Sequence, residues 1–338
     1  MDYRPLGRTG VQVSSLCLGT MMFGAWGNTD HDDSIRVIHA ALDAGINFVD
    51  TADVYSGGES EEIVGKALKG RRDNVVLATK FFMPMGEDVN QRGPSRRWIM
   101  TAVENSLRRL GTDHIDLYQV HRPDPAVDYE ETLGALTDLV RQGKVRSIGS
   151  SSFSGSQIVE AQTVARDRNL ERYRTEQPPY SLLTRSIELD VLPTVQRHGM
   201  GTLTYSPLGG GWLSGSWTAD SSPTSPARQR LAKRFDMSLP ENQAKLEAVQ
   251  ALQQVADDAG VTMIELAIAF VINHPGVTSA IVGPRTMEQL ESQLPAADVT
   301  LTAAVLDRID EIVKPGVTIN PADTSYGERV LAPDLRRR

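Results

Sequence analysis

Short apolar runs alternate along this chain with longer segments in which apolar residues recur every three or four positions. Short runs rich in β-branched residues are typical of buried strands, and the longer spacing is typical of helices packed on one face. The pattern predicts eight strands, at residues 15–19, 47–50, 74–80, 115–121, 145–150, 174–177, 201–205 and 279–282. It predicts helices at residues 35–42, 60–68, 95–110, 129–142, 154–168, 187–197, 241–258, 263–273, 287–294 and 303–313.

This alternation of strand and helix predicts parallel strands that are joined by right-handed crossovers. Eight such strands fit a closed (β/α)8 barrel. The alternative is an open, doubly wound sheet, in which a G-x-G-x-x-G turn usually follows the first strand. Here the first strand ends in Leu18-Gly19-Thr20 instead. We therefore expect an α/β protein with the TIM barrel fold.

Three segments lie outside the repeating pattern. Residues 3–13 consist of two extended pieces around Gly7 and Gly10, which predicts an N-terminal β-hairpin. Residues 209–239 form an insertion that begins with three glycines and is rich in Ser, Pro and Thr, and we expect a mobile lid there. Extra helices and a tail at about residues 315–338 complete the chain. No linker divides it, so residues 1–338 are predicted to form one domain.

The composition is that of an ordinary globular protein. Of the 338 residues, 40% are apolar and 23% are charged, which argues against disorder. The net charge of −8 argues against nucleic acid or a membrane surface as a partner. We identify neither a secretory signal nor an apolar run of about 18 residues, so a cytoplasmic protein is expected. The single cysteine, Cys17, lies in an apolar run and is predicted to be a buried thiol, and no metal site is predicted.

Polar residues of unusual type stand where three consecutive predicted strands end. Asp50 closes the second strand, Lys80 closes the third and His121 closes the fourth, while Tyr55 follows on the loop after Asp50. Each residue alone has an ordinary structural explanation, such as a turn cap or a surface lysine. Because a barrel places its chemistry at the carboxyl ends of its strands, we predict that the four side chains share one rim.

These four groups together suit the reduction of a carbonyl. A phenol has a pKa near ~10, so it is a reluctant proton donor at neutral pH. We expect Lys80 to lower the pKa of Tyr55, at about 1.4 kcal/mol for each pKa unit, and Asp50 to hold Lys80 in place. His121 would orient the carbonyl oxygen or share the proton transfer. No side chain provides a hydride, so a nicotinamide cofactor is implied.

At these positions the chain resembles the aldo-keto reductase superfamily. The resemblance extends from Leu6 to about Leu294, and the segments DAGINFVDTA (43–52) and GTDHIDLY (111–118) look like family signatures. It implies a (β/α)8 barrel and NADPH as the cofactor, bound without a Rossmann motif. It also implies that Asp50, Tyr55, Lys80 and His121 form the catalytic tetrad. The histidine favours carbonyl reduction, since relatives that reduce a C=C bond tend to carry Glu there.

The resemblance further implies a cofactor site along the rim. Ser151, Ser152 and Gln177 stand where the family holds the nicotinamide carboxamide, although Asn is commoner than Ser at the second position. Tyr205 matches the aromatic ring that stacks on the nicotinamide. Arg285 is our candidate for the 2′-phosphate, which a Lys-Ser pair and a later Arg hold in mammalian members. The other predicted cofactor contacts are Gly19, Thr20, Met21, Ser206, Leu208, Gly210, Gly283, Gln289 and Gln293.

The substrate is predicted only by class, as a small molecule with a carbonyl group. An apolar, aromatic-lined pocket is expected, with candidate walls at Phe23, Trp26, Phe81, Phe82, Arg122, Tyr180 and Trp212. The loops resemble bacterial branches that reduce aldehydes and branches that act on keto-deoxysugar nucleotides of secondary metabolism, and the second group is an alternative. A further alternative is a non-catalytic, cofactor-sensing subunit like the channel β-subunits. The lack of a long N-terminal extension argues against this alternative. A homo-oligomer is one possible assembly.

Overall fold

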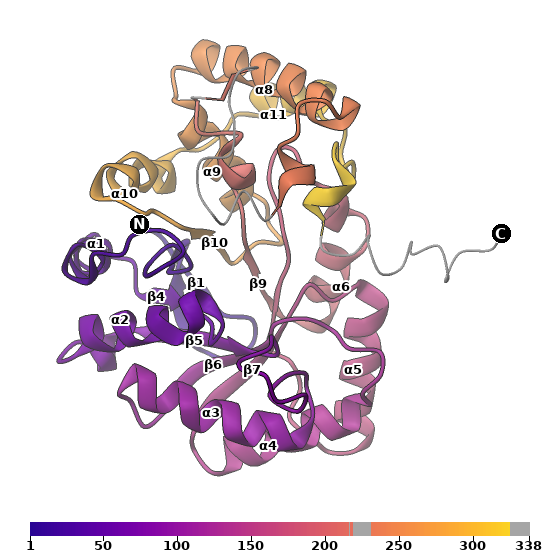
Figure 1. Cartoon of the computed structure of the whole chain (residues 1–338). Coiled ribbons are helices and arrows are strands. Elements are labelled where there is room, and N and C mark those ends of the chain that lie inside the picture. Colours follow the sequence, from indigo (N-terminus) through magenta and orange to yellow (C-terminus); the bar gives the residue numbers. More distant parts are fainter. Residues whose placement is uncertain (216, 219–230, 325–338) are drawn as a thin grey trace.

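Eight parallel strands form a closed barrel at the centre of the protein (Figure 1). The computed structural model describes residues 1–215, 217–218 and 231–324. The strands follow the chain around the barrel, and the last strand closes it by pairing with both the first and the seventh. They are β3 (Leu16–Gly19), β4 (Phe48–Asp50), β5 (Val76–Phe81), β6 (Ile115–Val120), β7 (Val145–Ser151), β8 (Thr175–Gln177), β9 (Gly201–Thr204) and β10 (Ser279–Val282). The predicted TIM barrel is confirmed.

Helices surround this barrel (Figure 1). They are α1 (His31–Asp43), α2 (Glu59–Leu68), α3 (Arg96–Leu110), α4 (Tyr129–Arg141), α5 (Gly155–Asp167), α6 (Val191–His198), α8 (Pro240–Ala259), α9 (Met263–Ile272), α10 (Met287–Gln293) and α11 (Ala303–Ile312). Capping residues set several of their boundaries. Ser95 accepts a hydrogen bond from the Trp98 N–H at the start of α3, and Gly111 ends that helix with a φ of 62°.

One helix differs from its prediction. The segment 187–197 is divided into the 3-10 helix η3 (Ser186–Glu188) and the shorter helix α6. Asp190 separates them with a φ of −136°, outside the helical range. Pro193 follows in the first turn of α6, where its missing N–H costs no hydrogen bond, whereas a continuous helix would place it in the interior. The proline therefore fixes where α6 begins.

The apolar core has two layers, one inside the barrel and one between the barrel and the helices. Side chains alternate across each strand, so successive residues contribute to different layers. Cys17 and Phe48 point into the barrel interior, while their neighbours Leu16 and Val49 face the helices. Cys17 is fully buried, as predicted.

The predicted N-terminal hairpin is present and covers one end of the barrel. Its strands β1 (Tyr3–Pro5) and β2 (Gln12–Ser14) pair antiparallel. Leu6 and Val13 belong to the cluster inside the barrel. Gly7 has a φ of 58°, and a Cβ there would come within 2.7 Å of the Gly201 amide nitrogen. A glycine is therefore required at this close contact between hairpin and β9.

The two ends of the insertion pack against the body of the protein. They contain the 3-10 helices η4 (Gly209–Gly211) and η5 (Ala232–Arg234). The Trp212 ring stacks on Phe235, and Lys245 Nζ lies 4.4 Å from the centre of the Trp212 ring. The middle of the predicted lid and the tail after residue 324 lie outside the described residues. None of the helices in the described chain is long and apolar enough to span a membrane.

Candidate active site

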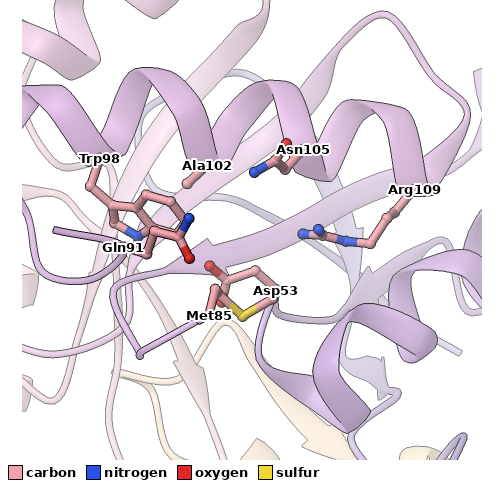
Figure 2. A pocket seen from close by; sticks show the side chains of 7 residues that line it. All are labelled: Asp53, Met85, Gln91, Trp98, Ala102, Asn105 and Arg109. Carbon is pink, nitrogen blue, oxygen red and sulfur yellow. The ribbon is translucent and has the colours of Figure 1, made fainter. Parts of the chain in front are cut away.

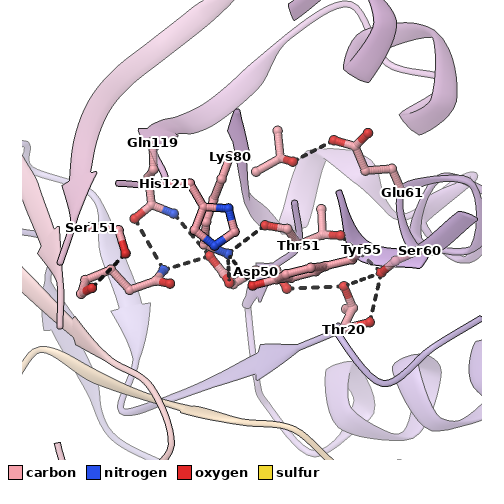
Figure 3. A network of polar contacts seen from close by, with 12 residues as sticks. Thr20, Asp50, Thr51, Tyr55, Ser60, Glu61, Lys80, Gln119, His121 and Ser151 are labelled. Atoms are coloured by element: carbon pink, nitrogen blue, oxygen red, sulfur yellow. Dashed lines mark hydrogen bonds and ion pairs between the residues drawn. The ribbon is translucent and has the colours of Figure 1, made fainter. Parts of the chain in front are cut away.

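The four predicted catalytic side chains lie together at the carboxyl end of the barrel strands (Figure 3). Lys80 Nζ donates a hydrogen bond to Asp50 Oδ1 at 2.5 Å and another to the Tyr55 hydroxyl at 3.1 Å. The rings of Tyr55 and His121 meet edge to face, with centroids 6.0 Å apart. Lys80 thus connects the carboxylate to the phenol, and the imidazole lies beside that phenol.

Strand register and side-chain alternation produce this arrangement. Asp50 is the last residue of β4, and His121 follows β6 directly. Lys80 pairs with Gln119 across the β5–β6 ladder. Because side chains alternate along a strand, Lys80 points into the barrel while Phe81 packs under the helices. Lys80 is fully buried, so its charge needs a partner, and Asp50 provides it.

The loop that carries Tyr55 is held against β5 by backbone hydrogen bonds. The N–H of Thr51 donates to the Ala78 carbonyl at 2.9 Å, and the N–H of Asp53 donates to the Lys80 carbonyl at 3.1 Å. Tyr55 then opens the 3-10 helix η1 (Tyr55–Gly58), in which Ser56 has a φ of 50°. These contacts fix the phenol above the lysine.

Two amide side chains complete the environment of Asp50. Gln119 Nε2 donates to Asp50 Oδ2 at 3.1 Å, and Gln177 Nε2 donates to the same oxygen at 2.9 Å. The sequence interpretation did not include Gln119. Its position two residues before His121 was a usable signal, because alternate residues of a strand face the same side. Together these amides orient the carboxylate that holds Lys80.

Burial acts on the pKa values of Tyr55 and Lys80 in opposite directions. Burial raises the pKa of Tyr55 above its usual value, and the nearby Lys80 only partly offsets this effect. Burial also works against the charge of Lys80, but Asp50 and Tyr55 outweigh it and raise the pKa of Lys80. The expected net lowering of the pKa of Tyr55 is therefore not found in the protein alone. The reason is that desolvation penalises the phenolate more than one ammonium stabilises it.

His121 is a neutral imidazole in this site. Burial, followed by the charges of Lys80 and Arg122, lowers the pKa of His121 well below its usual value. Its Nδ1 atom is buried and has no hydrogen-bond partner among the described residues. A neutral imidazole carries one N–H and one acceptor nitrogen, so it can donate to a carbonyl oxygen without adding charge.

The residues predicted for the nicotinamide lie beside this tetrad. The Ser151 hydroxyl donates to the Gln177 carbonyl at 2.9 Å, which joins the ends of β7 and β8. The Ser152 hydroxyl lies 3.3 Å from the Tyr205 hydroxyl and accepts a hydrogen bond from Arg122 at 2.7 Å. Ser152 has a φ of 61°, which is uncommon for a residue other than glycine. The structure thus brings the four residues predicted for the nicotinamide, together with Arg122 from the predicted substrate pocket, to one side of the tetrad.

Comparisons with known proteins agree with this geometry. A model of the aldo/keto reductase family matches residues 15–314. The chain belongs to this family. It is 40% identical to the uncharacterized oxidoreductase YrpG of Bacillus subtilis, over 92% of this chain and 96% of that protein. It is 38% identical to the aldo-keto reductase YhdN of the same organism, over 99% of both chains. It is also 35% identical to a probable voltage-gated potassium channel subunit beta of Arabidopsis thaliana, over 93% of this chain and 97% of that protein. The protein is therefore an oxidoreductase of a family that uses nicotinamide cofactors.

In this aldo/keto reductase, the other predicted cofactor residues lie on three segments: the end of β3 with its loop, the stretch from β10 to α10, and the stretch that follows β9. Gly19 and Gly283 are adjacent where β3 and β10 end, and Met21 is exposed on the following loop. The Gln289 side chain accepts a hydrogen bond from the Arg285 N–H at 2.8 Å. The Arg285 guanidinium has no ion-pair partner within the described chain. Ser206 and Leu208 lie between β9 and the insertion, and Gly210 lies in its first turn, η4. Gln293 lies buried on α10, with its Oε1 unpaired among the described residues.

Thr20 does not fit its predicted role through its side chain. Its hydroxyl is fully buried, 2.9 Å from the Ser60 hydroxyl and 3.2 Å from the Asp50 carbonyl. These bonds tie the β3 loop to the start of α2. The side chain of Thr20 therefore supports the tetrad loop and is closed to a ligand.

Four of the predicted pocket walls belong to the core instead. Phe23, Phe81, Tyr180 and Trp212 are all almost completely buried in the layer between barrel and helices. The Tyr180 hydroxyl donates to Glu188 at 2.6 Å, and the Trp212 indole N–H donates to the Arg234 carbonyl at 3.2 Å. Their polar atoms are thus satisfied inside the protein. Trp26, whose ring centroid lies 6.0 Å from that of Tyr55, stays a candidate together with Phe82 and Arg122, which are partly exposed.

A separate cavity of about 130 Å³ lies behind the tetrad loop (Figure 2). Asp53 and Arg109 point into it from opposite sides, and α3 contributes Trp98 and Asn105. Neither carboxyl oxygen of Asp53 has a partner among the described residues, and burial, followed by the charge of Glu61, raises the pKa of Asp53 well above its usual value. The cavity is large enough and polar enough to hold water. None of the predicted site residues lines it.

Proposed function

We propose that this oxidoreductase reduces the carbonyl group of a small aldehyde or ketone to an alcohol, with NADPH as cofactor and Tyr55 as general acid. The observation that carries the proposal is the buried chain of contacts from Asp50 through Lys80 to the Tyr55 hydroxyl. A structural ion pair alone would not require a phenol at its end. A phenol held by an ammonium is instead the arrangement that a proton donor to an oxygen needs.

The residues at the rim fit a nicotinamide dinucleotide. Ser151 and Gln177 would hold the carboxamide, with the Tyr205 ring against the nicotinamide. Arg285 would pair with the 2′-phosphate, which accounts for a guanidinium without an ion-pair partner in the described chain. When bound, NADPH supplies the hydride that is added to the carbonyl carbon.

The side chains of the tetrad provide the proton that the carbonyl oxygen receives. The Tyr55 hydroxyl gives its proton to the carbonyl oxygen as negative charge develops there, and the resulting phenolate is stabilised by Lys80 at 3.1 Å. Asp50 keeps Lys80 in place and charged. The neutral His121 donates an N–H to the same oxygen and orients the substrate. A high phenol pKa before reaction keeps the proton available, since the unreacted site holds Tyr55 protonated.

A second candidate rests on the relatives. A protein that is 35% identical over nearly its whole length is named as a probable channel subunit beta. This supports a cofactor-sensing role without turnover as the competing function. Steady-state oxidation of NADPH with a panel of aliphatic and aromatic aldehydes and keto-sugar nucleotides separates the two. Turnover supports the reductase, and binding of NADPH without turnover of any substrate supports the sensor.

Tyr55→Phe tests the role of the phenol directly. We expect carbonyl reduction to fall by at least 10²–10⁴-fold, the usual contribution of general acid catalysis, with little change in NADPH affinity. Tyr118→Phe is the matched control, because it removes a buried hydroxyl that has no partner among the described residues. If Tyr55→Phe keeps activity within a few-fold of the wild type, Tyr55 is not the acid.

A further inference from the structure

A fully buried carboxyl group, Glu176, lies directly before Gln177 at the end of β8. We propose that Glu176 is a positioning residue. Its carboxylate holds the turn after β7 in the conformation that presents Ser151 and Ser152 to the nicotinamide end of the cofactor, so that neutralising it weakens cofactor binding. This inference rests on the proposed function.

The side-chain hydrogen bonds of Glu176 go to the end of β7 and to the turn that follows it. Its Oε2 accepts a hydrogen bond from the Ser150 hydroxyl at 2.5 Å, and its Oε1 accepts one from the Phe153 N–H at 3.0 Å. The Ser152 N–H donates instead to the carbonyl of Gln177, the residue after Glu176, at 3.1 Å. The hydrogen bonds from Ser150 and Phe153 therefore connect Glu176 to both ends of the segment that carries Ser151 and Ser152.

The backbone of this segment has an unfavourable conformation at Ser152 that neighbouring contacts must stabilise. Ser152 has a φ of 61°, and conformations of this kind cost roughly 1–3 kcal/mol in residues other than glycine. They persist when the surrounding contacts enforce them. Without the negative charge, the hydrogen bonds that Ser150 and Phe153 donate to this side chain would be weaker, and the turn would gain freedom to relax. A relaxed turn would move the Ser151 and Ser152 hydroxyls away from the cofactor.

Glu176 is able to change charge near neutral pH. Burial raises its pKa to about 7, although the hydrogen bonds from the Ser150 hydroxyl and the Phe153 N–H oppose the rise. The other charged or titratable groups that act on this region are Arg122, which favours the ionised form, and the phenols Tyr129 and Tyr173, whose pKa values burial raises. Those phenols stay neutral, so Glu176 is the group that titrates here.

The direction of the pH effect follows from the charge. The ionised carboxylate accepts hydrogen bonds at both oxygens, whereas the protonated acid turns one oxygen into a donor. The turn is therefore held best above pH 7, and cofactor affinity should fall as the pH decreases through about 7. A hydrogen bond to a charged group is more stabilising than one to a neutral group. The difference in free energy corresponds to roughly a fivefold change in affinity.

The experiment measures the dissociation constants of NADPH and NADH between pH 6 and pH 8.5, by fluorescence of the bound cofactor. NADH serves because it lacks the 2′-phosphate, which itself titrates in this range. In the wild type we expect both constants to increase about fivefold from high to low pH, beyond any change that phosphate causes. In Glu176→Gln, NADH affinity should be independent of pH and equal to that of the wild type at low pH. Glu188→Gln, at a partly buried carboxylate that accepts from the Tyr180 hydroxyl and has no contact with the turn after β7 among the described residues, should keep the wild-type profile.

Ser150→Ala provides a second variant, which removes one donor and leaves the carboxylate. In this variant the decrease in NADH affinity should begin at a higher pH than in the wild type, because the hydrogen bond from Ser150 lowers the pKa of Glu176. If Glu176→Gln binds NADH like the wild type at every pH, the inference is wrong while the proposed function stands. If the wild type binds neither cofactor, both are wrong. A purely structural role would lower the melting temperature of Glu176→Gln without removing the pH dependence, and that result also overturns the inference.

Discussion

Removing the positive charge of Lys80 gives the sharpest test of how this site is built. Lys80 is fully buried and donates to Asp50, to the Thr51 carbonyl and to the Tyr55 hydroxyl. In Lys80→Met the Asp50 carboxylate stays buried with only the amides of Gln119 and Gln177. Breaking a buried ion pair from one side typically costs about 3–5 kcal/mol, so we expect a loss of stability of this order.

The double variant separates the charge effect from lost packing. In Lys80→Met with Asp50→Asn no charge remains unpaired, so the double variant should be more stable than the sum of the two single losses predicts. A coupling of roughly 0.5–3 kcal/mol is typical for residues in direct contact. Lys69→Met, at an exposed lysine, is the control and should change stability by less than about 0.5 kcal/mol.

Equilibrium urea unfolding, followed by circular dichroism, measures these differences in the free energy of unfolding. The reasoning fails if the losses of the two single variants simply add in the double variant. It also fails if Lys80→Met is as stable as Lys69→Met. Independently of stability, Lys80→Met should abolish most carbonyl reduction, because the phenolate of Tyr55 loses its nearest positive charge.

Two further predictions concern the cofactor and the hairpin. Arg285→Ala should weaken NADPH binding roughly ten- to a hundredfold and leave NADH binding unchanged, because a charge-assisted contact is worth about 1.5–3 kcal/mol. If titrations show that both cofactors bind equally more weakly, Arg285 does not contact the 2′-phosphate. Gly7→Ala should destabilise the protein by more than Gly10→Ala. Both glycines have positive φ, but only at Gly7 does an added Cβ meet backbone, at 2.7 Å from Gly201 N, and nothing lies within 4 Å at Gly10. Thermal melting that shows equal losses in both variants would contradict this.

The sequence determined the fold and the members of the tetrad. Alternating strand and helix patterns require parallel strands, and eight of them close into a barrel whose strand ends meet at one rim. Asp50, Lys80 and His121 stand at successive strand ends, so their convergence follows from chain connectivity alone. Gln119 was predictable in the same way, because it lies on β6 two residues before His121, which follows that strand directly.

Only the tertiary structure decided which aromatic residues face the site. Phe81 directly follows Lys80, and a shift of one residue along a strand exchanges the two faces. Phe23, Tyr180 and Trp212 lie on loops whose course no periodicity describes, and the folded chain places all three in the core. Trp26 comes from a similar loop and packs beside Tyr55 instead.

The protonation of the site was likewise settled by three-dimensional packing. The sequence shows that a lysine accompanies Tyr55, but it does not show how much water the fold removes from the phenol. Desolvation depends on all the surrounding atoms, and here it outweighs the lysine and raises the pKa of Tyr55. Glu176 follows the same rule. In the sequence it is an ordinary residue beside Gln177, and its burial against the turn after β7 makes its charge matter.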